Sequence, residues 1–328
     1  MNGFEELKFI DISREQDFIK YSDQISALTS RSKRDIYYLL YKNKYSYAFC
    51  IMDGDEIVGF QGFVYKPILI KKDVVPSFRS EFTIAKPKLR GSGIFAKFYK
   101  YTMDEIRRNY KEVYFWGETT HKGWIKFGFR MIKRYSFYQI FSKRIKQNIR
   151  KPEIFNRSIV NVLSVLFSVV NPFRFLLKGT IKVAERITYN QFKAFELNST
   201  NFKLRLYMDE EAFKWRYIEN DFHKYLFLTY EGSLMIIKEN NSEVTLVDIY
   251  TKTVTQYLLL IAYLMRKYTT VIIHGNLYAF YKTPYFWLNL LVGFTPFLGG
   301  GSFVECNLNA KRLSWKDLPL LEGWGLGV

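Results

Sequence analysis

The pattern of apolar and polar residues over the first half of the chain predicts a sheet built mainly from short strands. Residues 47–52, 56–65 and 78–85 are apolar runs rich in aromatic and β-branched side chains, which are typical of strands. The sequence Asp-Gly-Asp at 53–55 separates the first two runs and predicts a hairpin turn. These three runs are therefore expected to pair antiparallel.

Helices are expected before and after these strands. Ser13 and Gln16 resemble a capping box, which predicts that a helix begins there. Residues 94–110 predict another helix because apolar side chains recur every three or four positions. A strand is expected at 113–116 and a single closing strand at 129–141. The first half is thus predicted to mix helices with a mostly antiparallel sheet.

The most distinctive stretch joins the strand at 78–85 to the helix at 94–110. In the run Pro87 to Gly93, two glycines stand where the strand gives way to the helix, and Arg90 precedes the first of them. Glycines allow a tight turn that leaves backbone N–H groups pointing outward, next to the positive end of the helix dipole. The run predicts a corner that binds a pyrophosphate.

The second half repeats this order without the glycines. A hairpin at 226–238, a strand at 243–250, a helix at 254–265 and a strand at 270–274 are expected. The corner before the helix reads Thr-Lys-Thr at 251–253, and side chains there would hold a pyrophosphate away from the backbone N–H groups. One pyrophosphate site is therefore expected, in the first half.

Composition and charge narrow the class of partner. The chain of 328 residues carries a formal net charge of +18, which fits nucleic acid, anionic lipid surfaces or polyanionic small molecules. No zinc-finger spacing or recognisable nucleic-acid motif accompanies the charge, so nucleic acid is not expected. The two cysteines, Cys50 and Cys306, lie in apolar strand patterns and favour a cytoplasmic, reducing compartment.

A connector is expected between the two halves. An apolar run at 158–170 is too short to span a bilayer and favours a buried or inter-domain helix, with a helix in a membrane interface as the alternative. A basic cluster precedes it and is either a solvated surface or an anion- or membrane-facing one. Its members are Lys133, Arg134, Lys143, Arg144, Lys146, Arg150 and Lys151.

The glycine corner and its neighbours resemble the GNAT superfamily of acyl-CoA-dependent N-acyltransferases. The family signature is Gln or Arg, two residues, Gly, one residue, then Gly or Ala, and Lys88, Gly91 and Gly93 occupy those positions here. Lys88 departs from the signature, although its ammonium group can still meet phosphate as a point charge. A Gly-Phe pair at 128–129, four residues after Trp124, resembles a later segment of the family.

The resemblance implies an α/β (α+β) fold with two GNAT-like domains. Each would be a mixed, mostly antiparallel sheet flanked by helices, and the second would be degenerate. The expected boundaries are 1–145 for the acetyl-CoA-binding domain, 146–200 for a linker with an apolar helix, and 201–328 for the degenerate domain. The segment Trp-Arg-Tyr at 215–217 resembles the start of the second half in double-GNAT bacterial proteins.

The resemblance also implies acetyl-CoA as the acyl donor and no metal. The coenzyme would thread between the strands at 78–85 and 113–116, and its pantetheine amides would pair with the backbone where those strands separate. The residues expected to bind it are Ile84, Ala85, Lys88, Leu89, Arg90, Gly91, Ser92, Gly93 and Ile94.

The catalytic groups are less well defined by the resemblance. Many family members have a tyrosine as general acid where this sequence has Trp124, and an indole cannot supply a proton at neutral pH. His121, Tyr114 and Tyr135 are the candidate acids, and Glu81 and Glu118 are the candidate bases. The alternative for His121 is an ordinary surface histidine, and the alternative for either glutamate is a solvated or ion-paired carboxylate.

The leading hypothesis for the acceptor is a primary amine on a nucleotide- or lipid-linked amino sugar, as in bacterial surface-polysaccharide biosynthesis. Peripheral membrane contact would be compatible with it. Two alternatives are a non-catalytic GNAT-fold binding protein and a peptidoglycan-type aminoacyltransferase that uses aminoacyl-tRNA. The intact glycine corner disfavours the last. The residues expected to bind substrate are Trp124, Trp215, Arg216 and Tyr217.

Overall fold

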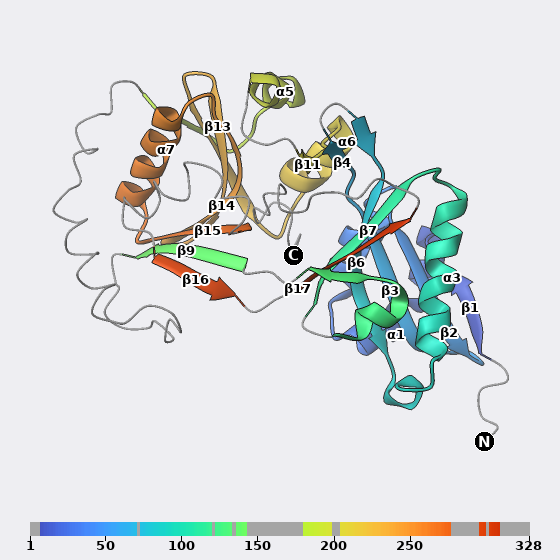
Figure 1. Ribbon diagram of the computed structural model, residues 1–328. Coiled ribbons are helices and arrows are strands. Elements are labelled where there is room, and N and C mark those ends of the chain that lie inside the picture. The colour runs from blue at the N-terminus through green and yellow to red at the C-terminus, as the bar shows by residue number, and fades with distance from the viewer. Residues whose placement is uncertain are drawn as a thin grey trace, which may run out of the picture. The chain divides into compact units, whose positions relative to one another are not determined.

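The chain forms two compact units (Figure 1). The computed structural model describes residues 7–70, 73–119, 122–132, 136–142, 180–198, 204–276, 295–299 and 302–308. Unit 1 consists of Met1–Lys133, Leu206–Met208 and Ser302–Leu313, and unit 2 of Arg134–Arg205, Asp209–Gly301 and Ser314–Val328. The basic cluster at 133–151, the candidate acid Tyr135 and the apolar run at 158–170 lie outside the described residues.

Unit 1 is built on a seven-stranded sheet in which only one neighbouring pair is parallel, β6 with β7. The hairpin and the third strand expected at 47–85 are confirmed by β2, β3 and β6. The strand order is β1 (Lys8–Asp11), β2 (Tyr47–Asp53), β3 (Glu56–Tyr65), β6 (Ser77–Ala85), β7 (Val113–Thr119), β17 (Ser302–Leu308) and β8 (Arg130–Ile132). Two short strands, β4 (Ile68–Ile70) and β5 (Asp73–Val75), form a separate small sheet with β11 (Leu204–Leu206).

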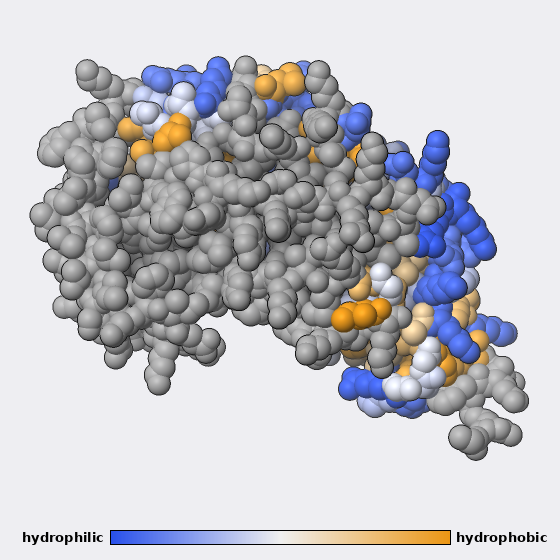
Figure 2. All heavy atoms as spheres, viewed as in Figure 1, coloured by the Kyte–Doolittle hydropathy of each residue, from blue (hydrophilic) through white to orange (hydrophobic). Residues whose placement is uncertain are grey.

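The main helix of unit 1 packs through the apolar stripe that its sequence predicts. This helix, α3 (Ile94–Arg108), buries Phe98, Thr102 and Ile106, and two of them join a core with Phe63 of the sheet. Burial of a side chain such as Phe98 or Phe63 stabilises the fold by about 2 kcal/mol. The outer side of α3 is hydrophilic (Figure 2). The other helical elements are α1 (Glu15–Thr29), α2 (Lys33–Ile36), the π-helical turn η1 (Tyr37–Tyr41), and the 3-10 turns η2 (Pro87–Leu89) and η3 (Lys122–Phe127).

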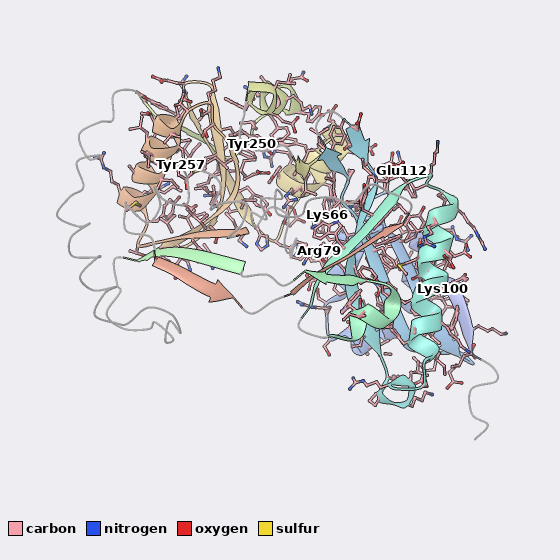
Figure 3. The ribbon with its side chains drawn as sticks, viewed as in Figure 1. Lys66, Arg79, Lys100, Glu112, Tyr250 and Tyr257 are labelled. Atoms are coloured by element: carbon pink, nitrogen blue, oxygen red, sulfur yellow. The ribbon has the colours of Figure 1, made fainter. Side chains whose placement is uncertain are left out.

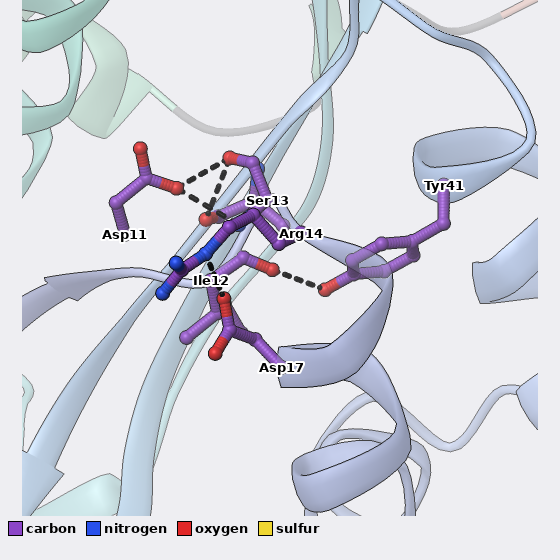
Figure 4. A network of polar contacts seen from close by, with 7 residues as sticks. Asp11, Ile12, Ser13, Arg14, Asp17 and Tyr41 are labelled. Atoms are coloured by element: carbon purple, nitrogen blue, oxygen red, sulfur yellow. Dashed lines mark hydrogen bonds and ion pairs between the residues drawn. The ribbon is translucent and has the colours of Figure 1, made fainter.

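The predicted capping box at the start of α1 is wrong. The N-cap is Arg14, and no side chain caps the helix there. The Ser13 hydroxyl is instead used by the strands, since it accepts a hydrogen bond from Ala48 N (3.0 Å) and contacts the Asp11 carboxylate (Figure 4). The Tyr41 hydroxyl donates to Ile12 O (3.0 Å), so the turn η1 is tied to the same strand end.

Unit 2 has a seven-stranded sheet of the same plan. Its strand order is β10 (Lys182–Ala184), β12 (Lys224–Tyr230), β13 (Ser233–Asn240), β14 (Glu243–Tyr250), β15 (Thr270–Asn276), β9 (Ser136–Ser142) and β16 (Thr295–Gly299). Its helical elements are α5 (Tyr189–Asn198), α6 (Glu210–Phe213), the π-helical turn η5 (Lys214–Ile218) and α7 (Val254–Lys267). The hairpin, strand, helix and strand expected over 226–274 are confirmed.

The two units repeat one sequence of elements. In each, a one-turn α-helix runs directly into a π-helical turn, then come three antiparallel strands, a long helix, and a strand parallel to the one before that helix. The third strand of each unit also contains a register shift against the second. Shared irregularities of this kind support an internal repeat more firmly than a shared strand order does, because π-helices and bulges are uncommon.

Each sheet contains one strand from the opposite half of the sequence. Strand β17, near the end of the chain, lies between β7 and β8 in unit 1, and β9 lies between β15 and β16 in unit 2. The single strand expected at 129–141 is therefore wrong. It is two strands, β8 and β9, that belong to different sheets.

Candidate functional site

The parallel strands β6 and β7 of unit 1 separate after the third residue of β6. They are paired from Ser77↔Tyr114 to Arg79↔Trp116, and no further pairs join them among the described residues. Beyond that point β6 pairs only with β3, and β7 only with β17. The edge of β6 that faces the gap therefore presents backbone groups without a strand partner, which suits a ligand with amide groups.

A bulge shapes β6 directly after the strands separate. Gly62 pairs with Glu81 and Phe60 with Ile84, so β6 contains one more residue than β3 over this stretch. Within it Phe82 adopts a φ of +53°, a conformation that is rare for a side chain larger than glycine. The bulge redirects the backbone of β6 at the point where it faces the gap.

A buried polar network holds the bulge in place. The Gln61 side chain is fully buried, donates to Ser80 Oγ (2.8 Å) and accepts from Thr83 Oγ1 (2.6 Å). Tyr99 of α3 donates its hydroxyl to the same Ser80 oxygen (3.0 Å). Sequence reasoning did not identify these four residues. Their only signal was a run of polar side chains, Ser80 and Thr83 with Gln61 opposite, inside otherwise apolar strands.

The N-terminus of α3 lies at the end of β6 and lacks a side-chain cap. Its N-cap is Gly93, with φ of +79°, and Gly91 has φ of +80°. A Cβ atom at either glycine would meet nothing within 4 Å, so the corner is open. The N–H groups of Gly91, Gly93, Phe95 and Ala96 donate to no acceptor in the described part of the chain. Open N–H groups at the positive end of a 15-residue helix are an arrangement that favours anion binding.

The two basic side chains at this corner differ in whether they have an ion-pair partner among the described residues. Lys88 Nζ is bonded to the Asp53 carboxylate on the β2–β3 hairpin, and Asp53 raises the pKa of Lys88 through this hydrogen bond. Arg90 is exposed, and no ion pair or side-chain hydrogen bond engages it in the described residues. The Ser92 hydroxyl donates to Leu89 O (2.7 Å) and accepts from Ile94 N (3.2 Å), so it closes the turn. Ile84 and Ala85 are partly exposed at the end of β6.

A buried ion pair lies where β6 and β7 begin to separate. Arg79, which is 4% exposed, has its Nη1 3.0 Å from Glu81 Oε1 (Figure 3). Its guanidinium carbon is 5.7 Å from the centre of the Trp116 ring, and Trp116 Nε1 donates to Ser77 Oγ (3.2 Å). Glu81 is thus an ion-paired carboxylate beside the gap, whereas Arg79 was not identified from the sequence.

The other residues predicted for catalysis, together with Trp124, lie in different parts of unit 1. Tyr114 lies on β7 and is 2% exposed. Glu118 lies further along β7, where its backbone pairs with Phe303 of β17. His121 lies outside the described residues. Trp124 is 9% exposed and belongs to the core under α3, where its ring contacts Tyr99 edge to face at 5.3 Å. The Trp124 ring is therefore used in core packing.

The corresponding corner of unit 2 is closed by side chains. Thr253 is the N-cap of α7, and a full capping box joins its side chain and backbone to Gln256. The Gln256 side chain also accepts from Ser233 Oγ (2.8 Å) and donates to Glu231 O (3.0 Å). The N-terminus of α7 is thus capped from within the protein, in contrast to that of α3.

The predicted substrate-binding residues of the second half lie together on η5. Trp215 is partly exposed, while Arg216 and Tyr217 are buried. The Tyr217 ring lies edge to face with Tyr225 at 5.2 Å, and its hydroxyl is 3.4 Å from Asp248 Oδ2. Burial raises the pKa of Tyr217 well above its ordinary value, so the hydroxyl stays protonated.

Comparison with known proteins finds likeness in structure alone. No protein-family model matches the chain, and no curated protein matches it. A GCN5-related N-acetyltransferase from Kribbella flavida has a TM-score of 0.56 at 11% identity, covering 92% of this chain and 70% of that one. A tandem GNAT protein from the clavulanic acid biosynthesis pathway has a TM-score of 0.51 at 11% identity, covering 94% and 100%. The chain has a tandem GNAT fold.

The fold expected from the glycine corner is thereby confirmed, as is its class of two mixed sheets flanked by helices. The chain is also similar in structure to N-myristoyltransferase of Saccharomyces cerevisiae with bound myristoyl-CoA, at a TM-score of 0.55 and 10% identity, covering 95% of this chain and 85% of that one. In the described residues, no group of acidic, His or Cys side chains is arranged to hold a metal ion, and no helix is long and apolar enough to cross a membrane.

Proposed function

We propose that unit 1 is an acyl-CoA-dependent N-acyltransferase domain. The observation that carries this proposal is the alignment of two features along β6, the separation from β7 after Arg79 and the open N-terminus of α3 at the strand's far end. A pantetheine arm needs an unpaired strand edge, and a pyrophosphate needs unpaired N–H groups. Both stand on one continuous stretch of chain, from residue 79 to residue 96.

The backbone hydrogen bonds around η2 support a shorter set of phosphate-binding N–H groups than the whole run 88–94. Leu89 N and Arg90 N already donate to carbonyls within η2, so the N–H groups left for phosphate oxygens are those of Gly91, Gly93, Phe95 and Ala96. Arg90 would add the nearest fixed charge. Lys88 would contribute less, because Asp53 already neutralises it. The backbone of Ile84 and Ala85 would pair with the pantetheine amides.

Of the candidate bases, Glu81 is the one that we propose for catalysis, because it lies beside the gap between β6 and β7. Its carboxylate is partly exposed (14%) and lies two residues beyond the last β6–β7 pair, on a strand whose bulge fixes the backbone around it. A carboxylate there would orient a water that takes the proton from an amine. Because the Glu81 carboxylate is already ion-paired with Arg79 at 3.0 Å, it would act on the amine through an ordered water.

Acetyl is the acyl group we propose, and the acceptor we propose is a primary amine on a nucleotide- or lipid-linked amino sugar. The formal net charge of +18 supports an anionic acceptor. The rival proposal of a non-catalytic binding protein has one observation in its favour, since Trp124 occupies the core where a general acid was expected. The open corner at Gly91 and Gly93 argues against an aminoacyl-tRNA-dependent enzyme, which has no coenzyme A pyrophosphate to bind.

The test is turnover of acetyl-CoA in the presence of candidate amines. Purified protein would be incubated with acetyl-CoA and each of a panel of nucleotide-linked amino sugars, simple amines and amino acids, and the acetylated product measured by mass spectrometry. Transfer to an amino sugar, and weaker transfer to simple amines, supports the proposal. Saturable acetyl-CoA binding without transfer to any amine would favour the binding protein instead.

A further inference from the structure

Unit 2 contains a buried positive charge for which the described residues provide no ion pair. Arg216 on η5 is 8% exposed, and its Nε is fully buried without a hydrogen-bond acceptor. Among the described residues, Asp248 is the carboxylate whose charge acts on Arg216 and raises its pKa. The Tyr217 ring lies 5.4 Å from the guanidinium carbon.

The surroundings of Arg216 are polar and come from several elements of unit 2. Asp248 on β14 accepts hydrogen bonds from the hydroxyls of Tyr250 (2.9 Å) and Tyr217 (3.4 Å), and Tyr250 is labelled in Figure 3. Tyr225 on β12 lies against Tyr217 and accepts from Asn220. Burial raises the pKa of Tyr217 and of Tyr250, so both hydroxyls remain donors.

This cluster lies beside a gap like that of unit 1. The parallel strands β14 and β15 pair from Glu243↔Thr270 to Leu246↔Ile273 and no further among the described residues. Asp248 and Tyr250 stand on the part of β14 beyond the last pair, after the register shift between Ile236 and Ile237 of β13. Unit 2 thus retains a separated strand pair although the N-terminus of α7 is capped.

A buried guanidinium without an anion is costly. The desolvation of a charged group amounts to several kcal/mol in a protein, and a single cation–π contact with a tyrosine recovers about 1–2 kcal/mol of it. Burial opposes the charge of Arg216, but the tyrosines and Asp248 outweigh it and raise its pKa, so the group stays charged. The charge is thus partly compensated within unit 2, while its buried Nε still lacks an acceptor.

We propose that the Arg216 cluster of unit 2 is a second binding site, and that its ligand is a small monocarboxylate. The guanidinium matches a carboxylate through two parallel hydrogen bonds, and the rings of Tyr217 and Tyr225 supply an apolar wall. A phosphate dianion fits less well, because Asp248 already contributes a negative charge to the cluster. Coenzyme A fits least, since the capping box of α7 leaves no place for its pyrophosphate.

The experiment uses the full-length protein and fluoroacetate as the probe, observed by its ¹⁹F resonance. Saturable line broadening at millimolar fluoroacetate is expected, together with displacement by acetate and little displacement by inorganic phosphate. Arg216→Met should abolish the broadening. Arg216→Lys keeps the charge but loses the forked geometry, so it should weaken binding about tenfold. Lys214→Met is the matched control, because it removes one exposed positive charge from the same turn, and it should bind as the wild type does.

Thermal unfolding supplies a second measurement that a purely structural arginine would not satisfy. Acetate should raise the unfolding temperature of the wild type and leave that of Arg216→Met unchanged. A folded Arg216→Met protein that still broadens the resonance would overturn the proposal. So would a wild type that binds no carboxylate, or a phosphate that displaces fluoroacetate as well as acetate does. Gly91→Trp, which blocks the corner of unit 1, should leave fluoroacetate binding intact, so this result is independent of the acyltransferase proposal.

Discussion

Arg79 and Trp116 form the last pair of the parallel ladder between β6 and β7, and the guanidinium of Arg79 lies against the Trp116 ring. The gap in the sheet of unit 1 therefore begins at a buried charge that is paired with Glu81 two residues further along. Arg79, Trp116 and Glu81 therefore lie together at the point where the two strands separate. Glu81 is also the carboxylate that we propose for catalysis.

Replacement of Glu81 tests both roles of that ion pair. Glu81→Gln should lower kcat about a hundredfold, because a positioned base contributes about that much, and should leave acetyl-CoA affinity unchanged. It should also reduce the free energy of unfolding by about 3 kcal/mol, since the buried Arg79 would lose its ion pair with Glu81. Steady-state kinetics and urea unfolding measure the two effects. Glu118→Gln is the comparison, and a Glu81→Gln enzyme with normal kcat would remove Glu81 from the mechanism.

The two basic residues of the corner should differ in their effect on coenzyme binding. Arg90→Ala should weaken acetyl-CoA binding about tenfold, as expected for loss of one charge-assisted phosphate contact. Lys88→Ala should change it little, because Lys88 is already paired with Asp53. Calorimetry at two salt concentrations checks this, with the smaller salt dependence expected for Arg90→Ala. A larger effect at Lys88 would mean that the lysine leaves Asp53 when the coenzyme binds.

Much of unit 1 could be predicted from its sequence because its signals are local. The strand, the two glycines and the helix after them are adjacent in the chain, and the φ values of Gly91 and Gly93 are those that such a corner requires. The absence of an open corner in unit 2 could likewise be predicted from Thr253, a strong N-cap residue.

The features that could not be predicted from the sequence depend on contacts between residues far apart in the chain. Lys88 is paired with Asp53 on the β2–β3 hairpin, and Gln61 of β3 is bonded to Ser80 on the neighbouring strand β6. The exchange of β9 and β17 has no sequence signal at all, because a seven-residue strand of mixed apolar and polar residues can pair within either sheet equally well. The domain boundaries at 145 and 200 remain a prediction, as do the roles of His121 and of the apolar run at 158–170.

The strand exchange makes each unit depend on the other half of the chain. A fragment that ends at Lys133 lacks β17, so β7 and β8 would have no strand between them and an exposed edge would remain. We expect this fragment to be insoluble or unfolded. A fragment in which residues 302–313 follow Lys133 through a flexible linker should instead fold. Circular dichroism and gel filtration check both, and a folded fragment without β17 would show that the strand is dispensable.

Stability should fall at alkaline pH. Burial raises the pKa of Cys50 to about 12, and burial also raises the pKa values of Tyr41, Tyr217 and Tyr250. These groups hold their protons more tightly in the folded protein, so their contribution is complete below the unfolded pKa of the thiol, about 8.5, and is lost as pH rises toward 12. Each group costs roughly 1.4 kcal/mol per pH unit across its range. Urea unfolding at pH 8, 9.5 and 11 measures the decline, which should be shallower in Cys50→Ala. An unchanged midpoint at pH 11 would contradict these shifts.

Binding of acetyl-CoA to the corner at Gly91 is the central claim, and calorimetry with wild type and Gly91→Trp tests it most directly. The indole would occupy the open space beside the N-terminus of α3, and Gly232→Trp is the control because it places the same side chain at a similar φ of +76° in a hairpin of unit 2. We predict saturable binding by the wild type and by Gly232→Trp, and none by Gly91→Trp. No binding by the wild type at millimolar acetyl-CoA, or equal binding by all three folded proteins, would contradict the account.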